Sequence, residues 1–381
     1  MTATPKAENR PRHNREMHPL RGAFSVLVLY DVAEQIDLDR IRAIRGSQPP
    51  AREPAFKHPA PEYVRFERPP VVEFPDPVSI APGQIFATRL RYFAYGVVSV
   101  ELELPFETGW DELIRLSSRF VAEPVIEKLT QDLLRARLRD IAPALIQPYG
   151  SWLSEEYCII NVREALDENA QPLTAASLLV RHGEDITRLV RGESVPLSKD
   201  ECADALQSSL SYYPTDLLVV GWVAAFIYDN NDEAAESAVQ LLEYANSQLL
   251  EFRHYDDVLT RILENVYNSL QRGGGPFRNW RTTRQAGKLN AVRLEVTDLT
   301  ERTDNAIKFV GDMFYARAYR MAATRVGVTD YRNLVERKLR IAADLYQSMV
   351  NDYHQARSFV LEAMVVAILV VELIHLFRGT F

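Results

Sequence analysis

Two Glu-x-x-His pairs, Glu251–His254 and Glu372–His375, are the closest match to a metal-binding pattern in this sequence. On an α-helix this spacing puts both side chains on one face, as in di-iron carboxylate bundles. A di-iron site also needs two further glutamates on facing helices. The two pairs fall in separate predicted regions of the chain, and chance explains them in a sequence with seven histidines and 52 acidic residues. We therefore predict no metal and no other cofactor.

The sequence lacks other motifs that would indicate catalysis. It has no His-Glu-x-x-His, no Gly-x-Ser-x-Gly, and no Lys-Ser/Thr after the glycine run 273–275 that a phosphate loop would need. Its two cysteines, Cys158 and Cys202, match no metal-ligand spacing, and so few thiols are typical of a reducing compartment. No catalytic residue is predicted.

An apolar run of 19 residues, Phe359–Phe377, lies between Arg357 and Arg378. About 20 apolar residues suffice to cross a bilayer as a helix. We therefore expect residues 358–378 to form a single C-terminal transmembrane helix. A helix buried in a bundle or coiled coil is the alternative. Residues 1–22 contain no secretory signal, so the body is expected to stay in the cytoplasm.

Two carboxylates, Glu362 and Glu372, interrupt this apolar run. Ionisable groups inside a membrane usually mark a function or a partner. Ten residues correspond to a rotation of about 280° on an ideal helix, so we expect the two side chains on different faces. Our hypothesis is that these intramembrane carboxylates specify helix–helix assembly.

Five basic residues and a tryptophan without any acid gather in residues 277–293: Arg278, Trp280, Arg281, Arg284, Lys288 and Arg293. Basic residues contribute about 1 kcal/mol each near an anionic leaflet, and Trp favours the interface. The length of the helices that follow would bring this segment back to headgroup level, so we predict a membrane-surface patch. A solvated loop and a nucleic-acid contact are the alternatives.

The elements that must position these residues are of mixed type. We predict a disordered tail at 1–22, an α+β domain at 23–145, and a second α+β segment with a long helix at 146–272. In the first domain, a continuous apolar run at 23–30 predicts a buried strand and alternating apolar residues predict strands within 84–104. Helices are expected at 110–121 and 123–142. In the second, we predict strands at 157–162 and 217–228 and a helix at about 233–270.

Residues 273–357 carry two stripes of apolar residues spaced alternately by four and three, the pattern of a coiled coil. The second stripe consists of Val335, Leu339, Ala342, Tyr346, Met349, Tyr353, Ala356 and Val360. We expect an intramolecular helical hairpin, and a parallel oligomer through one or both stripes is the alternative. The predicted fold class is thus α+β, with a mixed strand and helix body, a long coiled-coil-like hairpin and a C-terminal transmembrane helix.

Three segments resemble the "required for meiotic nuclear division" family: Tyr95–Val98, Tyr331–Ile341 and Leu361–Glu372. In that family a Leu-Glu is followed, ten residues after its glutamate, by a second glutamate, as at Glu362 and Glu372. The family's aromatic pair after Tyr-Gly-Val-Val is replaced here by Ser99-Val100, and its Pro-Glu-Phe-Phe-Trp segment is absent. The resemblance implies a divergent bacterial member of a membrane-anchored family whose domain has no known molecular activity.

Together these features predict a membrane-anchored scaffold or assembly protein whose soluble body binds other proteins. The alternative is a membrane-surface enzyme with its active site in the α+β body. The expected location is the bacterial inner membrane, or the mitochondrial inner membrane if the source is eukaryotic. Expected partners are membrane lipids and either other proteins or further copies of the chain. A net charge of −8 argues against general nucleic-acid binding.

Overall fold

The computed structural model describes residues 18–45, 69–81, 83–121, 123–271, 291–294, 296–298, 300 and 313–378. These residues divide into two compact units. The first contains residues 1–250 and 306–328, and the second contains 251–305 and 329–381.

The first unit is built on a single nine-stranded sheet with the order β2-β4-β5-β1-β6-β9-β8-β7, and β3 pairs with β4. The central strand β1 pairs antiparallel with both β5 and β6, and β6 pairs parallel with β9. The strands are β1 (Leu20–Ile36), β2 (Val71–Glu73), β3 (Val78–Ala81), β4 (Gln84–Tyr92), β5 (Val97–Thr108), β6 (Leu145–Glu164), β7 (Ser209–Leu210), β8 (Leu217–Val220) and β9 (Ala224–Tyr228).

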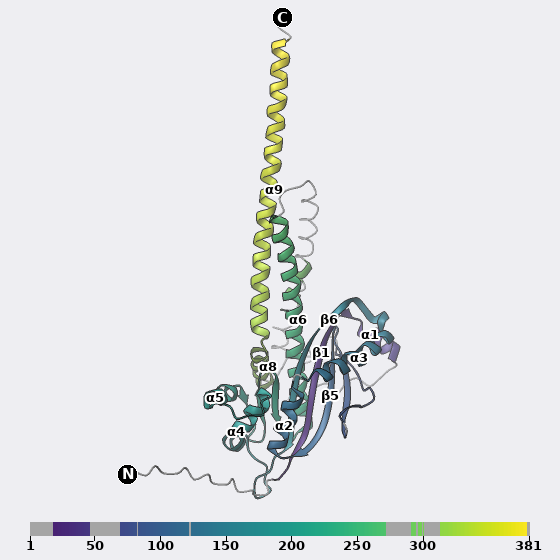
Figure 1. Ribbon diagram of the computed structural model, residues 1–381, viewed down its shortest axis with the longest axis vertical. Helices are drawn as coiled ribbons and strands as arrows, with labels where there is room; N and C mark the ends of the chain where they lie inside the picture. The colour runs from purple at the N-terminus through teal and green to yellow at the C-terminus, as the bar shows by residue number, and fades with distance from the viewer. Residues whose placement is uncertain are drawn as a thin grey trace, which may run out of the picture. The chain divides into compact units, whose positions relative to one another are not determined.

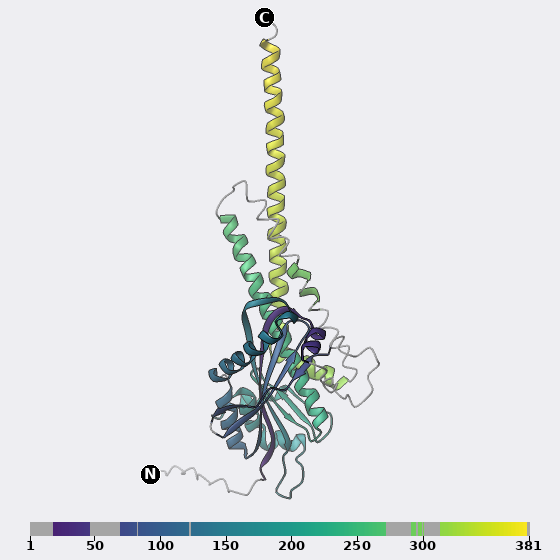
Figure 2. The same ribbon diagram turned by 90° about the vertical axis from the view of Figure 1, so that its right-hand side faces the viewer.

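Helices lie on both sides of these strands, as Figure 2 shows. The helices of the chain are α1 (Leu38–Arg45), α2 (Trp110–Phe120), α3 (Pro124–Asp140), α4 (Ala175–Arg191), α5 (Lys199–Gln207), α6 (Asp232–Gln271), α8 (Met313–Arg325) and α9 (Val328–Arg378). Helices α2 to α5 contribute the apolar core on one face of the sheet (Figure 1). The first half of α6 covers the opposite face.

Strand alternation separates an apolar face from a partly polar one. In β1, Phe24, Val26, Val28 and Tyr30 join the large core formed with α2 to α4. Because successive side chains point to opposite faces, their neighbours face α6 instead. On that second face, the pairing of β4 with β5 places Arg89 opposite Glu101. The sheet therefore has one ordinary hydrophobic core and one face that carries buried charge.

The observed elements confirm the mixed α+β class and differ from the expected ones in places. The sheet contains strands from both predicted α+β regions, because β6 pairs with β1 over most of its length. The apolar run 217–228 forms two strands, β8 and β9, that pair antiparallel around Gly221. Strand β1 begins at Leu20, within the segment predicted to be a tail. Residues 1–17 and most of the predicted first hairpin helix lie outside the described residues.

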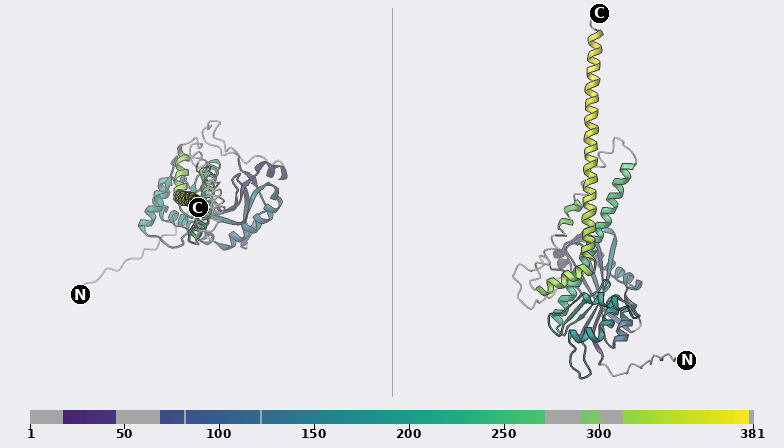
Figure 3. Two further views of the ribbon diagram at one scale, coloured as in Figure 1. Left: turned by 90° about the horizontal axis from the view of Figure 1, so that it is seen from above. Right: turned by 90° about the vertical axis from the view of Figure 1, so that its left-hand side faces the viewer.

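The predicted transmembrane helix is wrong. In the part of the chain that the structure describes, no helix combines the length and apolar character needed to cross a membrane. Helix α9 is continuous from Val328 to Arg378 (Figure 3). Two carboxylates, Glu362 and Glu372, interrupt the apolar run near the end of this helix. The predictions of a C-terminal membrane anchor and of a membrane location are therefore also wrong.

Candidate functional site

A buried charge network lies between the sheet and α6, and the regular geometry of both elements produces it. Arg89 and Arg91 are two apart on β4, so they point to the same face, and Arg89 pairs in register with Glu101 of β5. Glu236 and Glu243 are seven apart on α6, which places them on one side of that helix, two turns from each other. The two arginines from the sheet therefore meet carboxylates from the helix.

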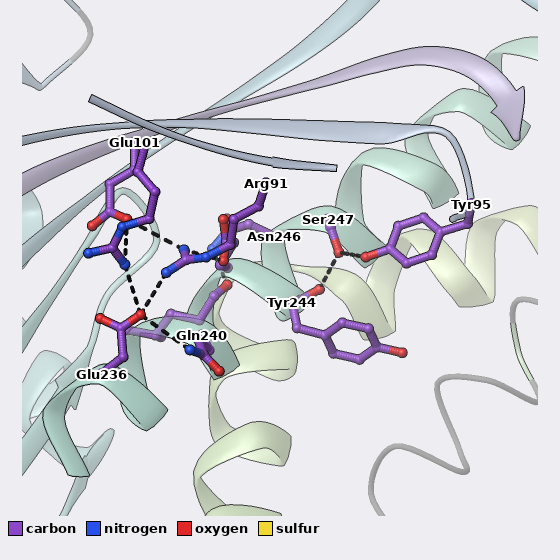
Figure 4. Close-up of polar contacts among 11 residues, drawn as sticks. Arg91, Tyr95, Glu101, Glu236, Gln240, Tyr244, Asn246 and Ser247 are labelled. Carbon is purple, nitrogen blue, oxygen red and sulfur yellow. Dashed lines mark hydrogen bonds and ion pairs between the residues drawn. The ribbon is translucent and has the colours of Figure 1, made fainter. Parts of the chain in front are cut away.

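Arg91 is the centre of this network, as the close-up in Figure 4 shows. Its Nη1 lies 2.6 Å from Oε2 of Glu243, and its Nη2 lies 2.6 Å from Oε1 of Glu236. Glu101 is more distant, with its Oε2 at 3.4 Å from Nη1 of Arg91 and also 3.4 Å from Nη1 of Arg89. Arg89 adds a 2.8 Å contact to Glu236. Arg91, Glu101 and Glu243 are all buried, so water screens these contacts little.

Negative charge exceeds positive charge in this network, and burial shifts its titration. Burial lowers the pKa of Arg91, but the carboxylates of Glu243, Glu101 and Glu236 more than offset this and raise it above its ordinary value. Burial raises the pKa of Glu243 although Arg91 opposes the change. Burial, followed by the charge of Glu101, also raises the pKa of nearby Glu103. The network thus holds a permanent cation and a carboxylate that accepts a proton more readily than usual.

Hydrogen bonds from α6 extend the polar layer away from Arg91. Gln240 donates to Glu236 at 3.2 Å, and Ser247 shares a 2.6 Å hydrogen bond with the hydroxyl of Tyr95. Asn246 donates back to the carbonyl of Leu242 within the same helix at 2.8 Å. A helix held at several points along one side has a defined register on the sheet. This arrangement positions α6, with Arg91, Glu101 and Glu243 buried and Glu236 at its exposed edge.

A small cleft lies elsewhere in the first unit, beside β8 and the start of α6. Its lining is mostly apolar and aromatic: Tyr212, Asp216, Leu217, Leu218, Ile227, Tyr228, Asp229, Ala234, Ala238, Phe314, Tyr315 and Ala318. Asp216 accepts hydrogen bonds from the backbone N–H groups of Tyr212 and Tyr213 at 2.7 and 2.8 Å. Asp229 accepts one from Asn231 at 2.8 Å. Both carboxylates therefore hold turns, as Asx motifs do.

Residues 361–374, near the end of α9, form a long exposed apolar surface, which we call the apolar tip. Every residue of the tip is exposed. Ten of them are large hydrophobic side chains that are 49–63% exposed: Leu361, Met364, Val365, Val366, Ile368, Leu369, Val370, Val371, Leu373 and Ile374. Monomeric proteins rarely expose contiguous apolar patches of more than a few hundred Å², and larger ones mark interaction sites.

Nearer its start, the same helix is packed against its own chain. Val335 and Ala342 of the second apolar stripe are buried, at 0% and 3% exposure. Lys338 donates to the hydroxyl of Thr260 at 2.7 Å and lies 2.6 Å from the carboxylate of Asp256, both on α6. Intramolecular contacts therefore cover the beginning of the stripe, whereas the described side chains of the apolar tip are exposed.

The structure separates the residues that the sequence predicted as sites. Glu362 and Glu372 are exposed on the apolar tip. In the predicted basic patch, Arg293 is exposed on a helical segment, and Arg278, Trp280, Arg281, Arg284 and Lys288 lie outside the described residues. No group of three or more metal-ligating side chains occurs within the described ranges. Cys158 is buried, and burial raises the pKa of its thiol.

The network around Arg91 was not predicted from the sequence. The signal that could have found it is an Arg-x-Arg strand followed closely by a strand with Glu101 and Glu103, together with glutamates at heptad spacing on a long helix. Each pattern alone is typical of a solvated surface. Only the register of β4 on β5 and the packing of α6 reveal that the two patterns meet.

Comparison with known proteins corrects the resemblance drawn from short segments. Residues 21–235 match the family model described as "Uncharacterized protein MJ0711, N-terminal domain". The "Uncharacterized protein MJ0711" of Methanocaldococcus jannaschii is 22% identical over 189 residues, which cover 50% of this chain and 58% of that protein. The chain thus spans little more than half the length of this relative. No solved structure matches the chain.

The matched region is the sheet unit with its covering helices, and it ends at the start of α6. Nothing in these matches indicates the meiotic nuclear division family, so that resemblance is wrong, and they do not show a bacterial source. With more than half of its residues inside the match, the chain belongs to the family of the MJ0711 N-terminal domain.

Proposed function

We propose that this chain is a scaffold or assembly protein that binds other protein chains through the apolar tip of α9. The observation that carries this proposal is the exposure of ten large hydrophobic side chains within 14 consecutive residues of helix, 361–374. Fully burying a side chain of this size contributes about 1.5–3 kcal/mol. Because each is about half exposed, a partner that covered all ten would gain roughly 10 kcal/mol before the costs of association.

The second unit supports this role because α9 has contacts that hold its beginning in place. The salt bridge and hydrogen bond of Lys338 to α6 combine with the buried Val335 and Ala342. We propose that this part is the coiled-coil-like helical packing that the apolar stripe predicts. A helix that is ordered before binding loses less conformational entropy when a partner covers it, so preorganisation favours association.

The sheet unit supports the scaffold proposal through the network around Arg91. Its charged side chains are committed to each other between the sheet and α6, with contacts of 2.6 to 3.4 Å. Such a network sets the register of one element on another. In this proposal the sheet unit holds the first half of α6 through this network.

Site-specific photo-crosslinking in cells tests the proposal. A photoreactive amino acid at Ile368 on the apolar tip is expected to form adducts with protein chains after irradiation. Val180 on α4 provides the matched control, because it is an apolar residue that is 86% exposed but stands apart from the tip. Absence of protein adducts at Ile368, or equal adducts at Val180, would contradict a binding role for the tip.

A further inference from the structure

The apolar stripe of α9 continues into the apolar tip without a change of spacing. After Val360 the alternation of three and four residues reaches Ala363, Ala367, Val370 and Ile374. This is the heptad pattern that packs helices side by side. The stripe is buried at Val335 and Ala342, where the chain's own helices cover it, and exposed at the tip. Among the described residues, the stripe is therefore covered near its start and exposed at the tip.

The two carboxylates of the tip lie on the other side of the helix from this stripe. At 100° per residue, the rotation of about 280° from Glu362 to Glu372 equals about 80° in the opposite direction. The two side chains thus share one half of the helix, which corrects the expectation that they occupy different faces. Ala367 is five residues from each glutamate, so it points about 140° away from both.

A seam centred on Ala367 therefore leaves both charges at the outside, where water solvates them. Alanines at 363 and 367 allow the backbones of two helices to approach closely, and Val370 and Ile374 supply the larger apolar side chains. Branched side chains at such positions are common in self-associating helices. The position of the charges and the spacing of the apolar residues are independent features, and both select the same face.

The chemistry of this face favours a second copy of the chain over a foreign partner. Within the tip there is no Lys or Arg, and the part of the stripe that runs through the tip, Ala363, Ala367, Val370 and Ile374, contains no polar side chain that would select a partner by charge or hydrogen bonding. What it offers is a repeat whose complement is the same repeat in register. A self-complementary surface of this kind is what a symmetric interface between identical chains requires.

The seam side of the tip supplies the area for such an interface. The ten half-exposed large side chains surround the helix, so only those on the seam side, among them Val366, Val370, Val371 and Ile374, would be buried. Together with Ala363 and Ala367 they offer a few hundred Å² per copy, less than the roughly 800 Å² per partner of a standard interface, which corresponds to a weak self-association. From these observations we infer that the apolar tips of two or more copies of this chain associate through the face formed by Ala363, Ala367, Val370 and Ile374. This inference rests on the proposed function and identifies the protein that the tip binds.

Two matched double variants of the full chain test the inference. Val370→Glu with Ile374→Glu places two charges on the proposed seam. Val365→Glu with Leu369→Glu has the same spacing and adds the same charge between Glu362 and Glu372, on the opposite side. Analytical ultracentrifugation over a hundredfold dilution series measures the mass of each protein against the protomer mass of 43.4 kDa.

We expect the unmodified chain to sediment as a multiple of the protomer mass. The seam variant should dissociate to protomers, with at least a tenfold weaker self-association, while the opposite-face variant stays assembled. Circular dichroism on each variant checks that the helix is retained. If the seam variant lost helix, the neutral pair Val370→Ser with Ile374→Ser would replace it, with the same expected dissociation.

Three results would overturn the inference: an unmodified chain that is a protomer at every concentration, a seam variant that stays assembled, or an opposite-face variant that dissociates as fully. The photo-crosslinking experiment separates this failure from failure of the proposed function. Adducts at Ile368 with a different protein, together with a monomeric chain, would retain the binding role and reject self-association. No protein adduct and no assembly would reject both.

Discussion

Replacement of Arg91 by Met tests whether the buried network fastens α6 to the sheet. Met keeps most of the length of the side chain but removes the cation, which leaves Glu101 and Glu243 buried beside Glu236 without their central counter-charge. Removing one member of a buried ion pair costs about 3–5 kcal/mol, because the remaining charges stay uncompensated. The free energy of unfolding of a domain is about 5–15 kcal/mol, so a large share would be lost.

Urea denaturation followed by tryptophan fluorescence measures this loss. With an m-value of about 3 kcal/mol/M, a cost of 3–5 kcal/mol lowers the midpoint by about 1–1.7 M. Arg21→Met is the matched control, because Arg21 also bridges two glutamates, Glu107 and Glu164, but its side chain is 57% exposed. The control should shift the midpoint far less, since exposed ion pairs contribute little.

The effect of Arg91→Met should also depend on pH. The pKa of Glu243 is already raised in the folded protein, and removing the neighbouring cation raises it further. A carboxyl group with a raised folded-state pKa binds its proton more tightly when folded, so stability falls as pH rises through the interval between the unfolded and folded pKa values. The loss of unfolding free energy caused by Arg91→Met should therefore be smaller at pH 5 than at pH 8. The reasoning would be refuted by a loss no larger than that of Arg21→Met, or by a loss that is the same at both pH values.

Two further predictions concern the sheet unit. Gly96 has a φ of +96°, and a Cβ there would lie 1.8 Å from the carbonyl oxygen of Ala33. Gly96→Ala should therefore lower the free energy of unfolding by about 1–3 kcal/mol or more, which thermal unfolding measures. A melting temperature equal to that of the unchanged protein would contradict this. Cys202 should react with a thiol reagent before Cys158, because Cys158 is buried and its thiol pKa is raised. Mass spectrometry should find a single modification at Cys202 under native conditions and two in denaturant, and early labelling of Cys158 would count against the packing described.

Local sequence patterns predicted many of the helices and strands, because their causes lie within a few residues. Helix α2 begins at Trp110 and α3 begins at Pro124, close to the expected positions, since acidic residues and Pro at a helix start act locally. The predicted strand 217–228 was divided because Gly221 lies against the backbone of α4, where a Cβ would be 2.4 Å from the carbonyl oxygen of Val190. That constraint comes from another element and has no local signal.

The amino-acid sequence by itself determined the mixed α+β class, the buried strand β1, the alternation along β5 and the heptad stripe of α9, since each follows from a local run or repeat of residues. Only the tertiary structure decided which polar residues would be buried. Arg91 and Glu243 are 152 residues apart and meet because a β-strand register and a helix face bring them together. The same holds for the stripe of α9, which is buried at Val335 and exposed at Val370, although its spacing is the same at both places. A pattern of residues predicts which surface is apolar enough to be buried. The packing of distant elements decides whether the chain itself buries it.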